Sequence, residues 1–220
     1  LHGAGSVRDN FINMEVGRAL ALQGFDIFLF DFRGHGGSGG DRTSLGEWEK
    51  RDIAGALAYL KSRGVEHVGV LGYSMGASAA LLAAPEQPEI EAVVTDSAFS
   101  DLFSVVESER IRIGVPNLFN PGYVFASREL FGVDILANEP KHAIARLGDK
   151  PVLLIHGEED ALIPVEQAYE LRDFARAAGN HNTELWVVPF ANHVGAVGSA
   201  REEYVARVAE FFDEHLGKRQ

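Results

Sequence analysis

A serine set between two glycines stands where an apolar run meets an alanine-rich run. The stretch Gly72 to Gly76 reads Gly-Tyr-Ser-Met-Gly, after the β-branched run His67 to Leu71 and before the small apolar run Ala77 to Ala84. This order predicts a strand, a sharp turn and a helix. Glycine lets the strand and the helix approach closely, so the turn can hold Ser74 in a strained conformation that presents its hydroxyl. An ordinary capping serine in a glycine-rich turn is the alternative.

A base and an orienting acid are needed beside this serine. A serine hydroxyl attacks well only when a base removes its proton, and imidazole does this near neutral pH. His193 is the best candidate among the eight histidines, because its loop directly follows the last expected strand, 183–188. The acid should come from another loop at the same sheet edge. Asp160, after the strand expected at 152–155, is our prediction, with Glu158, Glu159 and Asp96 as alternatives.

An attacked carbonyl also needs donors for the negative charge that develops on its oxygen, and backbone amides in glycine-rich turns supply them. The amide of Met75 lies at the start of the expected helix and can be one donor. The amide of Ala4, in the glycine-rich turn His2 to Ser6, can be the second. A simple tight turn is the alternative for Ala4.

Strand and helix patterns alternate along most of the chain. The continuously apolar segment Asp26 to Asp31 predicts a strand buried on both faces of a parallel sheet. Ser44 and Glu47 have capping-box spacing at the start of a helix expected at 44–63. The alternation indicates an α/β domain with right-handed crossovers and a site outside the carboxyl ends of the strands. We expect further strands at 67–71, 90–95, 151–156 and 183–188, and further helices at 9–23, 77–84, 165–178 and 201–216.

The segment 100–150 interrupts this alternation. It shows no clear strand pattern, and its aromatic side chains are interspersed with Pro116, Pro121 and Gly122. Such an insert is typical of a small helical lid, and an ordinary helical connection packed on the core is an equal alternative. As a lid it would form a compact apolar cover over the acyl pocket. The residues expected to line that pocket are Tyr73, Phe99, Phe119 and Val194.

The composition excludes several classes of function. The 220 residues are 46% hydrophobic and 24% charged, which suits one globular domain over 1–220. The net charge of −12 disfavours binding to a nucleic-acid backbone. The chain has no cysteine, and no H-E-x-x-H motif or carboxylate cluster suggests a metal. No apolar run approaches the ~20 residues of a membrane span. We expect a cytoplasmic protein with a small-molecule partner and no cofactor, and leave its oligomeric state open.

With the order Ser74, Asp160, His193 and the His-Gly turn at the start, the whole chain resembles the α/β-hydrolase superfamily. The runs 31–40, 96–99 and 156–160 resemble its serine aminopeptidase-like or Bem46-like branch. The resemblance implies Ser74 as nucleophile, His193 as base, Asp160 as orienting acid, and the amides of Ala4 and Met75 as the oxyanion hole. In that pattern, two further histidines belong to structural turns: His35 and His156.

The function that we predict is a serine hydrolase that acts through an acyl-enzyme, a carboxylesterase on short to medium acyl esters. The alternatives are a serine aminopeptidase, an acyl-protein thioesterase, and a non-catalytic binding protein on the same fold. A dinucleotide-binding turn is a weaker rival: the run Gly34 to Gly39 satisfies G-x-G-x-x-G, but residues 40–42 separate it from the next expected helix.

The beginning of the chain departs from the superfamily pattern. Members carry two or three strands before the His-Gly turn, and only Leu1 of the third stands here. A central strand cannot be removed without exposing unpaired backbone groups. We therefore expect these N-terminal strands in a longer natural protein whose mass exceeds 23.9 kDa.

Overall fold

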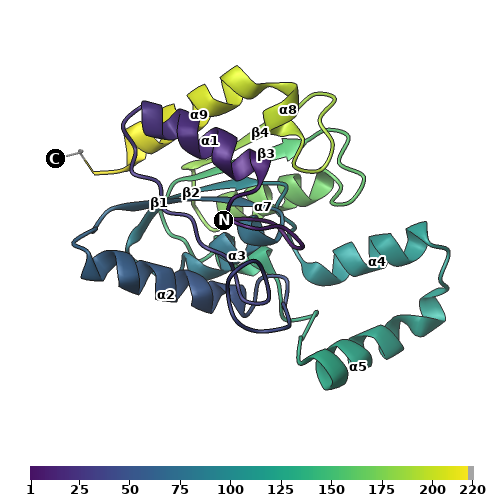
Figure 1. Cartoon of the computed structure of the whole chain (residues 1–220). Helices are drawn as coiled ribbons and strands as arrows, with labels where there is room; N and C mark the ends of the chain where they lie inside the picture. Colours follow the sequence, from purple (N-terminus) through teal and green to yellow (C-terminus); the bar gives the residue numbers. More distant parts are fainter. Residues whose placement is uncertain (218–220) are drawn as a thin grey trace.

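A four-stranded parallel sheet forms the centre of residues 1–217, the part of the chain that the computed structural model describes (Figure 1). Strand order follows chain order, β1-β2-β3-β4, and every neighbouring pair is parallel. Parallel neighbours require a crossover, and each crossover here carries at least one helix. The strands are β1 (Val68–Tyr73), β2 (Ile90–Asp96), β3 (Val152–Gly157) and β4 (Thr183–Val188), which confirms four of the expected strands.

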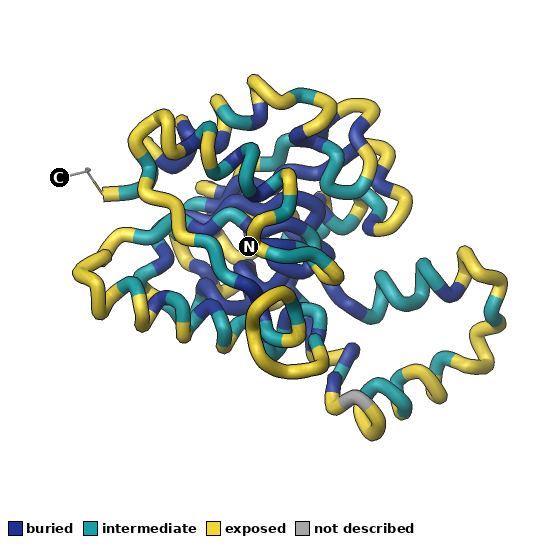
Figure 2. Tube along the Cα trace, in the orientation of Figure 1, coloured by how far each residue is buried: buried dark blue, intermediate teal, exposed yellow. Residues whose placement is uncertain are grey.

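Helices cover both faces of the sheet (Figure 1). Successive residues of a strand face opposite sides, so Val93 of β2 packs in one core cluster and Val94 in the other. Because both faces are covered, the strands are mostly apolar, and Figure 2 shows the sheet as the buried centre. The first cluster contains residues of α2 (Glu49–Ser62), α3 (Met75–Ala83), α6 (Pro140–Ile144) and α7 (Glu166–Ala177). The second contains residues of α1 (Phe11–Leu22), α8 (Ala196–Ser199) and α9 (Arg201–His215).

The expectation of a buried strand at 26–31 is wrong. This segment pairs with no strand, and Ile27 and Phe28 are partly exposed. A groove of about 1190 Å³ separates it from β1. Leu1 and Tyr73 also line this groove, and there the Leu1 carbonyl accepts the Tyr73 N–H at 3.0 Å, in the manner of a neighbouring strand. An extended segment joins a sheet only where its backbone groups reach a partner, and the groove prevents that here.

The expected capping box at Ser44 is also wrong. Helix α2 begins at Glu49, five residues later than the pattern suggested. Instead of pairing with Glu47, Ser44 accepts the Trp48 N–H and donates its hydroxyl to the Glu49 carboxylate at 2.7 Å. The side chain of Glu49 is fully buried, so the loop before α2 closes around it.

The insert forms α4 (Leu102–Arg112) and α5 (Asn120–Phe131), joined by the 3-10 helix η1 (Asn117–Phe119). We call residues 102–131 the arm, because its two helices extend beyond the body of the molecule (Figure 1). The helical insert is as expected.

The arm buries apolar side chains mainly at its base. There Leu102 packs with Phe99 and with Ile163 of the loop after β3. Towards the tip, Ile111 and Leu118 are exposed, and Figure 2 shows the arm as mostly intermediate or exposed. The expectation of a compact apolar cover is therefore wrong. Among the described residues, no helix combines the length and the apolarity needed to cross a membrane.

Candidate active site

Ser74 occupies a sharp turn between β1 and α3 with φ 51° and ψ −117°, outside the conformations that ordinary residues prefer. The flanking glycines make this turn possible. A Cβ at Gly72 would lie 2.4 Å from the carbonyl oxygen of Gly76, and one at Gly76 would lie 2.6 Å from that of His2. The strained elbow expected from the sequence is present.

Gly76→Ala should destabilise the protein, whereas the matched change Gly55→Ala should stabilise it. The added methyl at Gly76 would strike backbone atoms of residues 1 and 2. Gly55 lies inside α2 with nothing within 4 Å of its added Cβ, so alanine there gains about 1 kcal/mol of helix propensity. Thermal unfolding midpoints of the two variants check this. An unchanged midpoint for Gly76→Ala would contradict the close approach at the elbow.

Three side chains from different loops meet at the carboxyl edge of the sheet. The Ser74 hydroxyl lies 2.9 Å from Nε2 of His193, and Nδ1 of His193 lies 2.8 Å from Oδ2 of Asp160. His193 comes from the loop after β4 and Asp160 from the loop after β3. If Nδ1 carries the ring proton and donates it to the carboxylate, Nε2 is free to accept the serine proton. Residues far apart in sequence thus form a continuous Ser–His–Asp chain.

The environment of Asp160 favours its ionised form. Burial alone would raise its pKa, but the hydrogen bonds from His193 and the Ile163 N–H, together with the charges of His193 and His156, hold the pKa below its ordinary value. The Ile163 N–H donates to Oδ1 at 2.9 Å, and the Leu162 N–H donates at 3.0 Å. The carboxylate is therefore charged at neutral pH and fixed in orientation.

His156 has a structural place, as expected. Its Nε2 lies 2.7 Å from the Ile163 carbonyl, to which it donates. Burial lowers its pKa, so the ring stays neutral near pH 7. The loop that carries Asp160 is thus held at Ile163, whose carbonyl bonds to His156 and whose N–H bonds to Asp160.

The glycine-rich turn at the start of the chain lies beside the nucleophile. A Cβ built on Gly3 would stand 3.4 Å from Cβ of Ser74. Ala4 is exposed on this turn, and the Met75 amide lies at the first position of α3. The turn that carries Ala4 and the start of α3 thus both adjoin Ser74, and the oxyanion role of the two amides stays a prediction.

Two histidines brace the same turn by accepting backbone N–H groups. Nε2 of His2 accepts from Phe32 at 2.9 Å, and Nε2 of His35 accepts from Gly5 at 3.0 Å. Nδ1 of His35 contacts the Arg33 carbonyl at 2.9 Å. His35 thus belongs to a structural turn, as expected.

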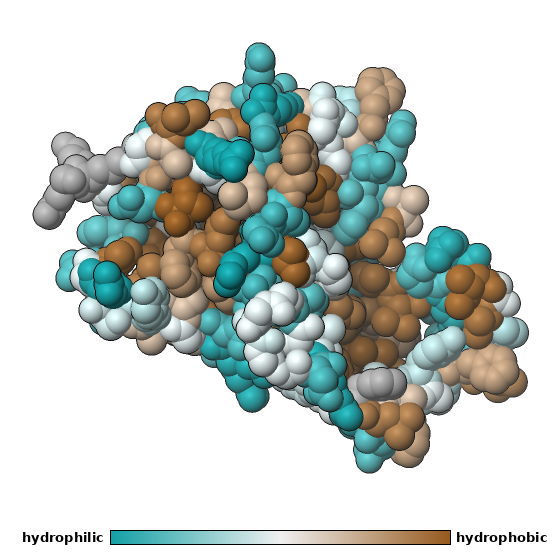
Figure 3. Space-filling model, in the orientation of Figure 1, coloured by the Kyte–Doolittle hydropathy of each residue, from teal (hydrophilic) through white to brown (hydrophobic). Residues whose placement is uncertain are grey.

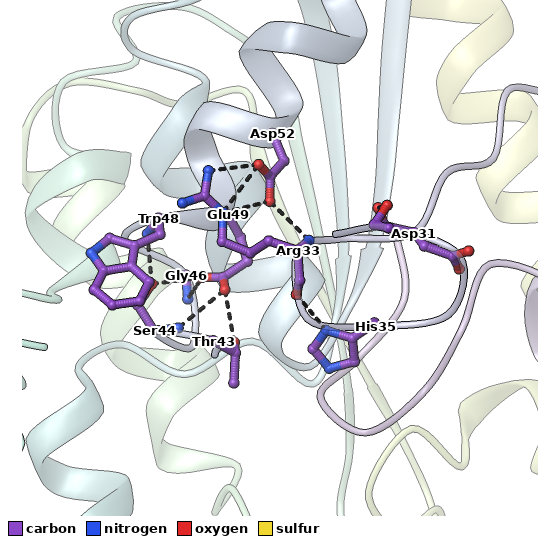
Figure 4. A network of polar contacts seen from close by, with 10 residues as sticks. Asp31, Arg33, His35, Thr43, Ser44, Gly46, Trp48, Glu49 and Asp52 are labelled. Carbon is purple, nitrogen blue, oxygen red and sulfur yellow. Dashed lines mark hydrogen bonds and ion pairs between the residues drawn. The ribbon is translucent and has the colours of Figure 1, made fainter. Parts of the chain in front are cut away.

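A polar network continues from this turn to α2 (Figure 4). Arg33 donates from both Nε and Nη2 to the Asp52 carboxylate, at 2.7 Å for Nη2. The Glu49 carboxylate accepts from Thr43, Ser44 and the Gly46 N–H. Burial would raise its pKa, but these bonds hold the pKa below its ordinary value. The sequence carried no signal for this buried anion, because its donors come from a loop without regular structure.

A family model described as the prolyl oligopeptidase family matches residues 15–219. The chain belongs to this family. Its fold is that of an α/β-hydrolase: the solved esterase Pf2001 of Pyrococcus furiosus superposes with a TM-score of 0.81 at 30% identity, over 99% of this chain and 82% of that one. Sequence relatives include the uncharacterised protein YqkD of Bacillus subtilis, 31% identical over 86% of this chain and 63% of its own. The lysophosphatidylserine lipase ABHD12 of Danio rerio is 25% identical over 89% of this chain and 51% of its own. The chain spans about half to two thirds of these two curated relatives.

The rival dinucleotide interpretation does not fit this member of the prolyl oligopeptidase family. The Gly34 N–H bonds to the Gly39 carbonyl at 3.0 Å, so the run closes on itself. A Cβ at Gly36 would lie 2.4 Å from the Asp31 carboxyl group, and α2 begins only at Glu49. A dinucleotide turn must open a helix at once, and this one does not.

The four residues predicted to line the pocket lie in different parts of this family member. Tyr73 is 4% exposed and packs towards α9, and its contact with substrate stays a prediction. Phe119 is 54% exposed on η1 of the arm, and no contact brings it to Ser74. Phe99 is buried at the arm base. Val194 follows His193 directly and is half-buried, which leaves it the best placed of the four.

The alternatives to Asp160 are placed elsewhere. Glu158 and Glu159 are exposed at the start of their loop. Asp96 is fully buried at the end of β2, and its carbonyl oxygen accepts the Ser74 N–H at 2.8 Å. Nδ1 of His193 contacts Asp160 and not Asp96. The described residues contain no group of three His, Cys, Asp or Glu side chains able to hold a metal ion.

Proposed function

We propose that this chain is a serine hydrolase that forms an acyl-enzyme on Ser74, and that its substrates are short to medium acyl esters. The observation that carries the proposal is the continuous contact from Ser74 through His193 to the ionised Asp160. This arrangement activates a hydroxyl for attack on a carbonyl carbon.

The proposed reaction has two steps, acylation of Ser74 and deacylation. In the first, His193 Nε2 takes the Ser74 proton while Oγ bonds to the ester carbonyl carbon, and the carbonyl oxygen gains negative charge beside the amides of Ala4 and Met75. The tetrahedral intermediate collapses when His193 returns the proton to the leaving alcohol, which leaves an acyl group on Ser74. In the second, His193 takes a proton from water, hydroxide attacks the acyl carbon, and Ser74 recovers its proton as the acid departs.

The preference for small neutral esters rests on charge and on similarity to a solved esterase. The net charge of −12 disfavours acidic substrates and leaves a neutral ester unopposed. The esterase Pf2001, at 30% identity, supports the same class.

A substrate panel tests the proposal. We expect kcat/KM to be highest for acetyl or butyryl p-nitrophenyl esters, lower for octanoyl and palmitoyl esters, and weak or absent for aminoacyl arylamides. A maximum at palmitoyl would favour a lipase or acyl-protein thioesterase. A maximum on arylamides would favour the aminopeptidase alternative, to which the family description lends support. No turnover, together with no labelling by a fluorophosphonate probe, would indicate a non-catalytic binding protein.

A further inference from the structure

Ser97 is a fully buried serine directly after β2 that both accepts and donates a hydrogen bond. Its Oγ accepts the Val194 N–H at 3.0 Å and donates to Oδ1 of Asp96 at 3.1 Å. Val194 is the residue after His193. One hydroxyl therefore connects the loop that carries the base to the end of β2.

The nucleophile is connected to the same place. The carbonyl oxygen of Asp96 accepts the Ser74 N–H at 2.8 Å. The Ser97 N–H donates to the Ile155 carbonyl of β3 at 3.0 Å. The dipeptide of Asp96 and Ser97 thus holds the backbone of the nucleophile and of the base loop, and is itself held by the strand that leads to Asp160.

Ser97 and its hydrogen-bond partner Val194 both have strained backbone conformations. Ser97 has φ 59° and Val194 has φ 54°, in the left-handed region. A β-branched residue rarely adopts this region, and it stays there only when its surroundings enforce the conformation. The hydrogen bond from Val194 N–H to Ser97 Oγ helps to hold Val194 in this conformation.

We propose that Ser97 is a positioning residue that sets the separation between the Ser74 hydroxyl and His193. The inference rests on the proposed function, because it assigns His193 the role of base. Without Oγ, the Val194 N–H loses its partner, the left-handed turn relaxes, and Nε2 of His193 leaves its place 2.9 Å from Ser74 Oγ. A displacement of about 1 Å in such a site can cost about 10²-fold in rate.

The carboxyl group of Asp96 modulates this bond. Burial raises its pKa to about 7, opposed by the Ser97 and Tyr204 hydroxyls and by His193. As Asp96 ionises, it draws the Ser97 proton towards itself, and Oγ becomes a better acceptor for the Val194 N–H. The hold on the base loop therefore strengthens as pH rises through about 7. The titratable groups that face Asp96 are Tyr73 on β1, Tyr204 on α9, His193 after β4 and Asp160 after β3.

The first test is Ser97→Gly, which removes the hydroxyl while glycine accepts the positive φ without strain. We expect kcat for a p-nitrophenyl ester to fall about 10- to 100-fold with KM within about threefold. The rate of fluorophosphonate labelling of Ser74 should fall in parallel, because that step also needs the base. Ser97→Ala, which keeps the strain, should lose as much rate and unfold at a lower temperature than Ser97→Gly.

The matched control is Ser78→Ala. Ser78 is a fully buried serine whose Oγ accepts the Phe99 N–H at 3.1 Å, so its hydrogen bond leads to Phe99 and not to the loop of His193. This control should lose stability and keep kcat within about threefold of the parent. Equal losses of kcat in Ser97→Gly and Ser78→Ala, or a Ser97→Gly variant within twofold of the parent, would overturn the proposal.

The second test is the pH dependence of Asp96→Asn, which keeps an acceptor for the Ser97 hydroxyl but cannot ionise. The ratio of parent to variant kcat should rise between pH 6 and pH 8, because only the parent gains the stronger bond. A ratio that stays constant over this range would contradict the coupling of Asp96 to the base loop. A parent protein that neither turns over esters nor labels with the probe would instead defeat the proposed function, so the two failures are distinct.

Discussion

Replacing Ser74 with alanine should lower kcat/KM for the preferred ester by about 10⁴- to 10⁶-fold. In the proposed mechanism the side-chain oxygen is the atom that bonds to the substrate, so no neighbouring group can replace it. The residual rate would come from the amides of Ala4 and Met75 and from substrate binding. Turnover of a p-nitrophenyl ester and covalent labelling by a fluorophosphonate probe measure the loss, and labelling should vanish entirely.

The variant should remain folded, because alanine leaves the glycines of the elbow untouched. Circular dichroism and the thermal unfolding midpoint check this, and Ser78→Ala, one turn along α3, serves as the active control. Ester hydrolysis within tenfold of the parent in Ser74→Ala would show that the assigned nucleophile is wrong.

His193→Ala should be nearly as damaging as Ser74→Ala, and Asp160→Asn should cost somewhat less, about 10⁴-fold. Alanine at 193 removes the proposed base outright. Asparagine at 160 keeps the shape but withdraws the negative charge and can favour the wrong ring tautomer. The measurements are kcat and the rate of probe labelling for each variant. An Asp160→Asn variant with near-parental kcat would move the orienting role to another carboxylate, with Asp96 the first to examine.

The pH dependence of activity in the parent protein follows from His193 and Asp160. A protonated His193 cannot act as a base, so activity should fall as pH drops from 8 to 5, and a flat profile would contradict the assignment. Asp160 does not limit activity in this range, because its pKa is held below the ordinary value. Its ionised form stabilises the fold above the unfolded-state pKa of about 3.9, and that contribution is lost as pH falls through the lower folded-state pKa.

The sequence predicted the elements that local chemistry controls. The glycines around Ser74 permit a strained turn, and the apolar and β-branched residues at 90–95 and 183–188 favour strands. The order of strands and helices then predicts that loops after β1, β3 and β4 meet at one edge, which is why His193 and Asp160 could be named in advance.

The sequence predictions failed where the structure depends on a neighbouring segment that the local sequence does not specify. Residues 26–31 have the composition of a buried strand, but a strand exists only when its backbone groups find a neighbour, and here a groove separates them from β1. The aromatic side chains of the insert predicted a compact cover. In the structure the arm packs on the body mainly through apolar contacts at its base.

The sequence by itself determined the fold class and the residue types that the proposed chemistry requires, because these follow from periodicity, glycine spacing and strand order. Tertiary structure decided what is held by contacts between distant residues: the ionised state of Asp160, the buried Glu49 and the bond from Val194 to Ser97. Each of these depends on a donor or acceptor at a distance and in a direction that no local pattern encodes, and hydrogen bonds lose their strength within a fraction of an ångström of misplacement.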